Sequence, residues 1–69
     1  MSEQLECRVV VTNHGDGRTF DLGMYDPLTG RYEFLGTHPV RDRERRVRDL
    51  QRTIEGAGHR LSLCERSAG

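Results

Sequence analysis

Arginines recur every three or four residues in one stretch of the chain, a spacing that suits recognition of an anionic partner. The four are Arg41, Arg45, Arg48 and Arg52. In a helix, at 100° per residue, they would occupy a sector of roughly 60° opposite the apolar side chains. Guanidinium groups in such a row can form bidentate contacts with phosphates or carboxylates. The spacing therefore predicts an anion-binding ridge, and the alternative interpretation is the solvated outer face of a charge-rich helix.

The positive and negative charges of the whole chain cancel, so electrostatic attraction to a partner has to come from one part of the surface. Eleven arginines, with no lysine, balance eleven acidic residues. The arginines are concentrated in residues 41–69, which hold eight of them against five acids, whereas residues 1–40 hold three against six. We therefore expect one basic and one acidic part of the surface, and no overall field that attracts nucleic acid or an anionic membrane.

Potential metal ligands and nucleophiles are present, but their spacing does not form a site. The candidates are Cys7, His14, His38, His59 and Cys64. No two of them stand in C-x-x-C or H-x-x-x-H spacing, and the two cysteines are expected on opposite faces of a sheet as reduced thiols. We therefore expect no metal, no cofactor, no disulfide and no thiol nucleophile. The loop at residues 15–17 lacks the further glycine and the lysine of a phosphate cradle and indicates a hairpin turn.

Alternation and helical periodicity in the apolar residues predict five elements that position these side chains. Residues 5–12 alternate between apolar and polar, which is typical of a half-buried strand. Glycine, asparagine, aspartate and proline at 13–17 and 26–30 indicate turns. At helical spacing, one apolar stripe is formed by Val40, Val47, Leu50, Ile54 and Ala57. Pro39 suits the first turn of a helix, and Gly56 and Gly58 suit its end. Strands are expected over residues 5–12, 18–25, 31–35 and 59–65, and a helix over residues 39–56.

These elements predict a single small α+β domain with the order βββαβ. Three antiparallel strands form a meander, and a fourth strand reached through a helix lies parallel to the first by a right-handed crossover. The expected sheet is four-stranded and mixed, in the order 3-2-1-4, with one helix packed on one face. The domain should span residues 1–69, ordered from about residue 5 to 65 with short frayed termini. Side chains expected between sheet and helix include Val9, Val11, Phe20, Leu22, Tyr32, Phe34, Leu61 and Leu63.

This strand order resembles the ribonuclease H-like half-fold and the small domain of HicB-type antitoxins. The resemblance is one of topology, since no sequence motif accompanies it. In such folds nuclease activity depends on several carboxylates that hold two metal ions. Glu6 and Glu65 are available on adjacent predicted strands, but acids at the strand centres are missing. The pattern therefore argues against a catalytic nuclease.

The face of the predicted sheet away from the helix is a second candidate contact surface. Val10, Tyr25 and Leu35 are expected there among charged side chains. Scattered apolar residues are ordinary on an open antiparallel face, but three on one small sheet also suit a docking or homodimer patch. The third and fourth strands are edges without a blocking proline or lysine, so another chain can pair with them. Aromatic platforms for nucleic acid are scarce, because Tyr25 alone is left outside the expected core.

The expected function is that of a non-catalytic binding module. A small regulator or inhibitor would occlude a protein partner, as antitoxins and phage-encoded inhibitors such as anti-CRISPR proteins do. The expected contacts are the arginine ridge, the patch of Val10, Tyr25 and Leu35, or both. The alternative is a nucleic-acid-binding protein that uses the same arginines on phosphates. A third and weaker alternative is an enzyme subunit or a metal-dependent hydrolase. No apolar stretch approaches a membrane span and no leader pattern begins the chain, so a cytoplasmic protein without membrane contact is expected.

Overall fold

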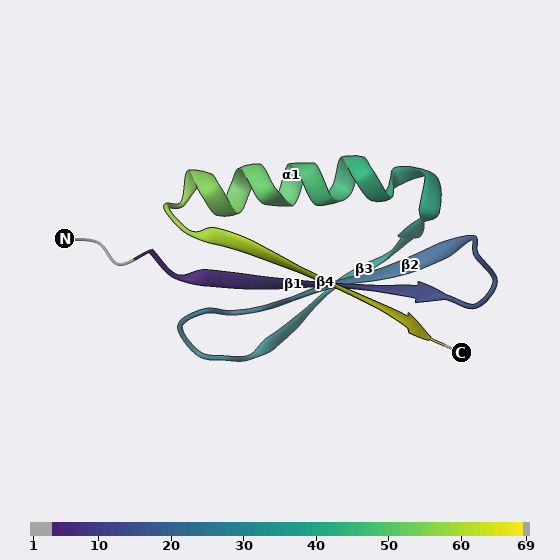
Figure 1. The fold of residues 1–69 in the computed structure, drawn as a ribbon, viewed down its shortest axis with the longest axis horizontal. Helices are drawn as coiled ribbons and strands as arrows, with labels where there is room; N and C mark the ends of the chain where they lie inside the picture. The colour runs from purple at the N-terminus through teal and green to yellow at the C-terminus, as the bar shows by residue number, and fades with distance from the viewer. Residues whose placement is uncertain (1–3, 69) are drawn as a thin grey trace.

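The computed structural model describes residues 4–68 as one sheet with a helix on one side (Figure 1). The strands pair in the order β3-β2-β1-β4, with β4 parallel to β1 and the other pairs antiparallel. This confirms the expected α+β class, the βββαβ order and the sheet topology. The elements are β1 (Glu6–His14), β2 (Thr19–Tyr25), β3 (Tyr32–Pro39), a 3₁₀ turn η1 (Val40–Asp42), α1 (Arg43–Gly56) and β4 (Arg60–Ala68).

Three strands extend beyond the ranges expected from the sequence. β1 continues to His14. β4 continues to Ala68 because it pairs with β1 along its whole length, as far as His14. The stretch after residue 65 therefore belongs to the sheet rather than to a frayed end. β3 continues to Pro39, and the helical segment begins at Val40, whose N–H donates to the Arg18 carbonyl at 2.9 Å. Residues 1–3 and 69, expected to be frayed, lie outside the described residues.

The core lies between the helix and the inner face of the sheet. Alternate residues of β1 and β2 point toward α1, and Ile54 is the buried residue that α1 contributes. Val47 and Leu50 pack against the same cluster, as the apolar stripe of the predicted helix required. Among residues 4–68, the buried members of this cluster are Cys7, Val9, Val11, Phe20, Leu22 and Ile54.

A glycine in the left-handed region ends the helix. Gly58 has a φ of +87°, where a side chain would be strained. The His59 N–H donates to the Ile54 carbonyl at 3.1 Å, and the Gly58 N–H donates to the Glu55 carbonyl at 3.0 Å. This pair of hydrogen bonds is a Schellman motif. Of the two glycines expected at the stop, Gly58 forms it, whereas Gly56 is the last residue of α1.

The inward and outward sides of β3 are reversed relative to the sequence prediction. Tyr32 pairs directly with Tyr25, and directly opposed residues of antiparallel strands share a face. Tyr32 and Phe34 therefore lie on the open face, 46% and 58% exposed, and their assignment to the core was wrong. The register follows from the turn between the strands, in which the Asp26 N–H donates to the Arg31 carbonyl at 2.8 Å.

Leu35 was expected on the open face, but it packs against the core. Because Phe34 lies on the open face, alternation places the next residue, Leu35, on the helix side, and a bulge then returns Thr37 to the open face. Gly23 opposes Phe34, whereas Asp21 opposes Thr37, so β3 contains one more residue than β2 over this interval. Gly36, with a φ of +107°, permits this bulge. The turn and the bulge together decide which side chains of β3 face solvent.

Candidate functional site

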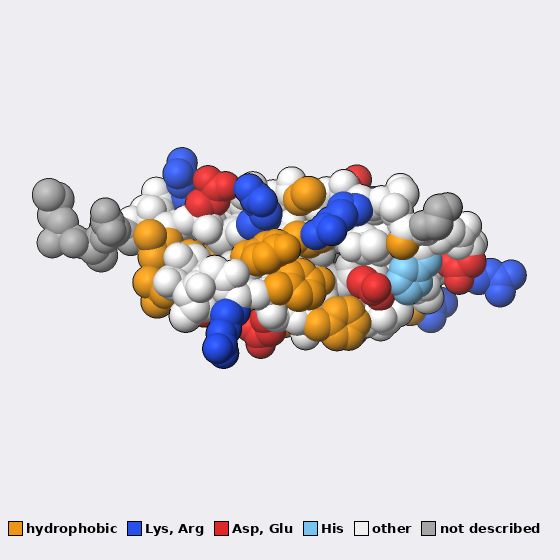
Figure 2. Space-filling view, turned by 90° about the horizontal axis from the view of Figure 1, so that it is seen from below, with side chains coloured by type: hydrophobic (Ala, Val, Ile, Leu, Met, Phe, Trp, Pro, Cys, Tyr) orange, Lys and Arg blue, Asp and Glu red, His pale blue; other side chains and the backbone are white. Residues whose placement is uncertain are grey.

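Three aromatic side chains gather on the face of the sheet that the helix leaves open. Tyr25 comes from β2, and Tyr32 and Phe34 come from the adjacent strand β3. The ring centroids of Tyr25 and Tyr32 are 5.2 Å apart in an edge-to-face arrangement. Figure 2 shows hydrophobic side chains at the centre of the face away from α1. We call Tyr25, Tyr32 and Phe34 the aromatic patch.

Val10 and Gly23 lie beneath the rings of the aromatic patch. Val10 of β1 lies on the same face but is only 1% exposed, so it supports the patch and is not itself available to a partner. Gly23 opposes Val10, and a Cβ at Gly23 would overlap the Tyr32 ring. Of the apolar residues expected to form a patch, Tyr25 belongs to it, Val10 lies under it and Leu35 is on the other side of the sheet.

Arginines border the aromatic patch on the same face. Arg8 pairs with Tyr25 across the β1–β2 ladder, and the parallel register of β4 with β1 places Arg60 and Arg66 on this face as well. All three arginines are exposed. Figure 2 shows basic side chains on both sides of the hydrophobic centre. Aromatic rings beside guanidinium groups are typical of protein interface hot spots and of sites for single-stranded nucleic acid.

The arginines expected to form a ridge are exposed, but they belong to two elements. Three of them lie on α1, whereas Arg41 lies in the preceding 3₁₀ turn. Arg45 Nη2 is 3.5 Å from Asp42 Oδ1, and Arg48 Nη2 is 3.3 Å from Glu44 Oε1. Exposed pairs of this kind contribute little, because solvent screening and side-chain entropy offset the attraction. The remaining member of the set, also exposed, is Arg52.

A hollow of about 580 Å³ lies between the first half of the helical segment and β4. Leu63, which was expected in the core, lines this hollow and is 46% exposed, and Val40 is 38% exposed. Arg43 forms an ion pair with Glu65 beside it. The apolar and basic residues that line this hollow are Val40, Val47, Leu63, Arg41, Arg43 and Arg48. A second hollow, of about 410 Å³, is lined in part by Glu55 and His59.

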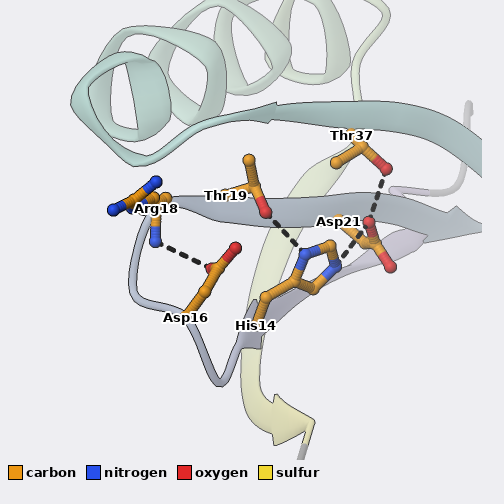
Figure 3. Close-up of polar contacts among 6 residues, drawn as sticks. All are labelled: His14, Asp16, Arg18, Thr19, Asp21 and Thr37. Carbon is orange, nitrogen blue, oxygen red and sulfur yellow. Dashed lines mark hydrogen bonds and ion pairs between the residues drawn. The ribbon is translucent and has the colours of Figure 1, made fainter.

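A polar cluster continues the open face toward the β1–β2 turn (Figure 3). Thr19 Oγ1 and His14 Nδ1 are 2.6 Å apart, and His14 Nε2 is 2.9 Å from Asp21 Oδ1. The Thr37 hydroxyl donates to the same carboxylate oxygen at 2.6 Å. These side chains come from β1, β2 and β3. The cluster therefore ties three strands together at one end of the sheet, and His14, assigned to a turn from the sequence, is the last residue of β1.

The carboxylate of Asp21 is the acidic group of this cluster. Hydrogen bonds from Thr37 and His14 lower the pKa of Asp21, because they stabilise the carboxylate form. A threonine, a histidine and an aspartate in one hydrogen-bond chain are also the components of a nucleophilic relay. Both imidazole nitrogens are already occupied, however, and neither of the two hollows is lined by these residues. The cluster offers donors and acceptors at the rim of the open face.

The two cysteines lie on opposite faces of the sheet, as the alternation of side chains along the strands predicted. Cys7 is buried in the core, Cys64 is half-buried next to Val10 on the open face, and both are free thiols. Burial raises the pKa of the Cys7 thiol, and the nearby Asp26 carboxylate raises it further, so the thiolate is disfavoured. Across residues 4–68, no three His, Cys, Asp or Glu side chains are grouped to hold a metal ion.

Comparisons with protein families, with characterised proteins and with solved structures find no match to this chain. No helix within the described residues has the length and apolar character needed to cross a bilayer. Two residues of the aromatic patch, Tyr32 and Phe34, were missed from the sequence. The signal that could have found them is the turn at residues 26–31, because it pairs residue 32 with residue 25 and gives both the same face.

Proposed function

We propose that this chain is a non-catalytic binding module whose open sheet face covers a site on a protein partner. The observation that carries the proposal is the exposure of Tyr32 and Phe34 beside Tyr25, bordered by Arg8. Tyrosine and arginine are enriched among the residues that dominate interface energetics. A hydrogen-bonded sheet already holds these side chains in place, which reduces the entropy lost on binding.

The charges around the aromatic patch indicate the chemistry of the partner surface. Arg8, Arg60 and Arg66 are exposed on this face. Its acidic residues include Glu6, which is exposed opposite Arg60, and Asp21, which is engaged with His14. A complementary surface would place apolar side chains against the aromatic patch and carboxylates opposite the arginines. A regulator of the antitoxin or anti-CRISPR kind, which acts by covering a partner's working surface, fits this arrangement. The arginines of α1 lie on the other layer and would serve a separate contact.

Variants of the aromatic patch, compared with an exposed apolar residue elsewhere, test this proposal. Leu28 is the matched control, because it is 80% exposed and lies in the turn between β2 and β3. Proteins captured by the wild-type chain from its native cells are identified, purified and titrated by calorimetry. Phe34→Glu should weaken the affinity by about 30-fold or more, the loss typical of a hot-spot residue. Leu28→Glu should leave the affinity unchanged.

Two outcomes would overturn the proposal. One is equal affinity of the wild type and Phe34→Glu for every purified partner. The other is loss of binding in the double variant Arg45→Glu/Arg48→Glu with full retention in Phe34→Glu. The second result would assign the contact to the helix.

Single-stranded nucleic acid is a second candidate ligand for the same face. Tyr32 and Phe34 add two exposed rings to Tyr25, and stacking of a base on such a ring contributes about 1–3 kcal/mol. Arg8, Arg60 and Arg66 could contact the phosphates. The logarithm of the binding constant should then fall linearly with the logarithm of the salt concentration, with a slope of about −0.7 per phosphate neutralised on a single strand. Fluorescence anisotropy with labelled oligo(dT) and oligo(U) at low salt checks this candidate. Binding that Phe34→Ala abolishes would favour nucleic acid, and a flat titration would exclude it.

A further inference from the structure

The two edges of the sheet differ in their protection against pairing with another strand. β3 contains the bulge at Gly36 and ends at Pro39, and both features hinder the addition of a strand. β4 is nine residues long and pairs with β1 in an unbroken register. It contains neither proline nor lysine. Within residues 4–68 no strand lies beside its outer edge, so β4 presents a row of unpaired backbone donors and acceptors.

Apolar side chains accompany the free edge of β4 on the helix side. Leu63 points to the same side as the core, because it lies next to Val9 in the parallel register, yet it is 46% exposed. Across the hollow of about 580 Å³ it faces Val47 and the partly exposed Val40. A strand added to β4 would cover these side chains as well as the backbone groups.

The sequence of β4 is complementary to itself in one antiparallel register. When a two-fold axis relates two antiparallel strands, the residue on the axis opposes its own copy and the residues around it exchange partners. With Ser62 on the axis, Leu61 of each copy opposes Leu63 of the other. Both leucines lie on the helix side, so two apolar pairs form over the joined sheet.

The neighbouring registers are less favourable. With Leu61 on the axis, Leu61 opposes its own copy and each Leu63 opposes His59, so one apolar pair forms instead of two. With Leu63 on the axis, Arg60 would directly oppose Arg66, and like charges directly opposite each other are destabilising. With Cys64 on the axis, Leu63 would oppose Glu65, which is already paired with Arg43. The register centred on Ser62 avoids both conflicts.

We infer that two copies of the chain associate through antiparallel β4 strands with Ser62 at the two-fold axis. The four strands of each copy then form one continuous sheet, with both helices on one side and both aromatic patches on the other. This interface uses an edge of the sheet rather than its open face. It is therefore independent of the ligand that the aromatic patch binds.

Light scattering coupled to size-exclusion chromatography measures the association directly. The wild type should show twice the mass of the 7.9 kDa chain over a concentration series. Leu63→Glu should shift the mass to that of a single chain, because it places carboxylates against the apolar pairs. Leu28→Glu and Phe34→Glu should remain dimeric. A monomeric wild type at all concentrations, a dimeric Leu63→Glu, or a monomeric Phe34→Glu would each overturn the inference.

Disulfide trapping tests the register and does not depend on whether Leu63→Glu folds. Ser62→Cys in a Cys64→Ser background should form a covalent dimer on oxidation with diamide, because the two side chains meet at the axis. In the wild type the two Cys64 residues would be four positions apart, about 13 Å, beyond the span of a disulfide of about 7 Å between Cα atoms. Efficient linkage of the wild type together with no linkage of the Ser62→Cys protein would contradict the inferred interface.

Discussion

At the residue scale, the Asp21 side chain contacts two other side chains on the open face. Its Oδ1 atom accepts from the Thr37 hydroxyl at 2.6 Å and contacts the His14 ring at 2.9 Å. These contacts hold the ends of three strands, and they stabilise the charged form of the carboxyl group. The pKa of Asp21 is therefore lowered from the ordinary value of 3.8.

This lowered pKa gives a pH dependence of stability with a defined sign. The contribution of Asp21 is fully present above the pKa of the unfolded chain and is lost as the pH falls through the lower pKa of the folded protein. Asp21→Asn should therefore reduce the free energy of unfolding at neutral pH, and its difference from the wild type should shrink in acid below about pH 3.8. Urea denaturation over a pH series checks this prediction.

Asp16→Asn is the control for that series, because Asp16 accepts one exposed hydrogen bond from the Arg18 N–H in the turn. At neutral pH it should reduce the free energy of unfolding by less than Asp21→Asn does, because it removes fewer contacts. A difference between wild type and Asp21→Asn that does not change with pH would mean that the hydrogen bonds at Asp21 do not favour its charged form.

At the element scale, the end of α1 contains two glycines with opposite requirements. Gly56 has a helical conformation with no atom close to an added Cβ, and alanine there should stabilise the protein by up to about 1 kcal/mol. Gly58 has a φ of +87°, and alanine there should destabilise the protein by about 1 kcal/mol. Urea denaturation gives the sign of each change in the free energy of unfolding, and opposite signs would support a Schellman motif at the end of α1. Two changes of the same sign would contradict it.

The strands and the helix were predictable because their periods are set by the backbone. Alternation placed β1 and β2, and the apolar stripe of Val47, Leu50 and Ile54 placed α1 against the sheet. β3 was not predictable by the same rule. Its aromatic residues suggested a core, but the preceding turn sets the sides on which Tyr32, Phe34 and Leu35 lie, and the bulge sets the side of Thr37. Apolar character alone does not determine which way a short edge strand faces.

At the scale of the whole molecule, the single helix leaves one side of a four-stranded sheet uncovered. A chain of 69 residues has limited core. The placement of three aromatic rings at its surface therefore removes a large apolar contribution from that core. The proposed partner contact would bury these rings. Tyr25 was predictable as a residue of the open face and the helix arginines as exposed residues, whereas the aromatic patch became visible only when the register of β3 was known.

Site-specific photocrosslinking tests most directly whether the open face is the contact surface. A benzophenone amino acid is introduced in separate proteins at Phe34 in the aromatic patch, at Leu28 in the turn and at Arg52 on α1. Each protein is irradiated with native-cell extract, and the adducts are identified by mass spectrometry. The expected result is one partner that crosslinks strongly from position 34 and weakly from positions 28 and 52. A partner that crosslinks from position 52 and not from position 34 would contradict the assignment of the binding surface to the sheet.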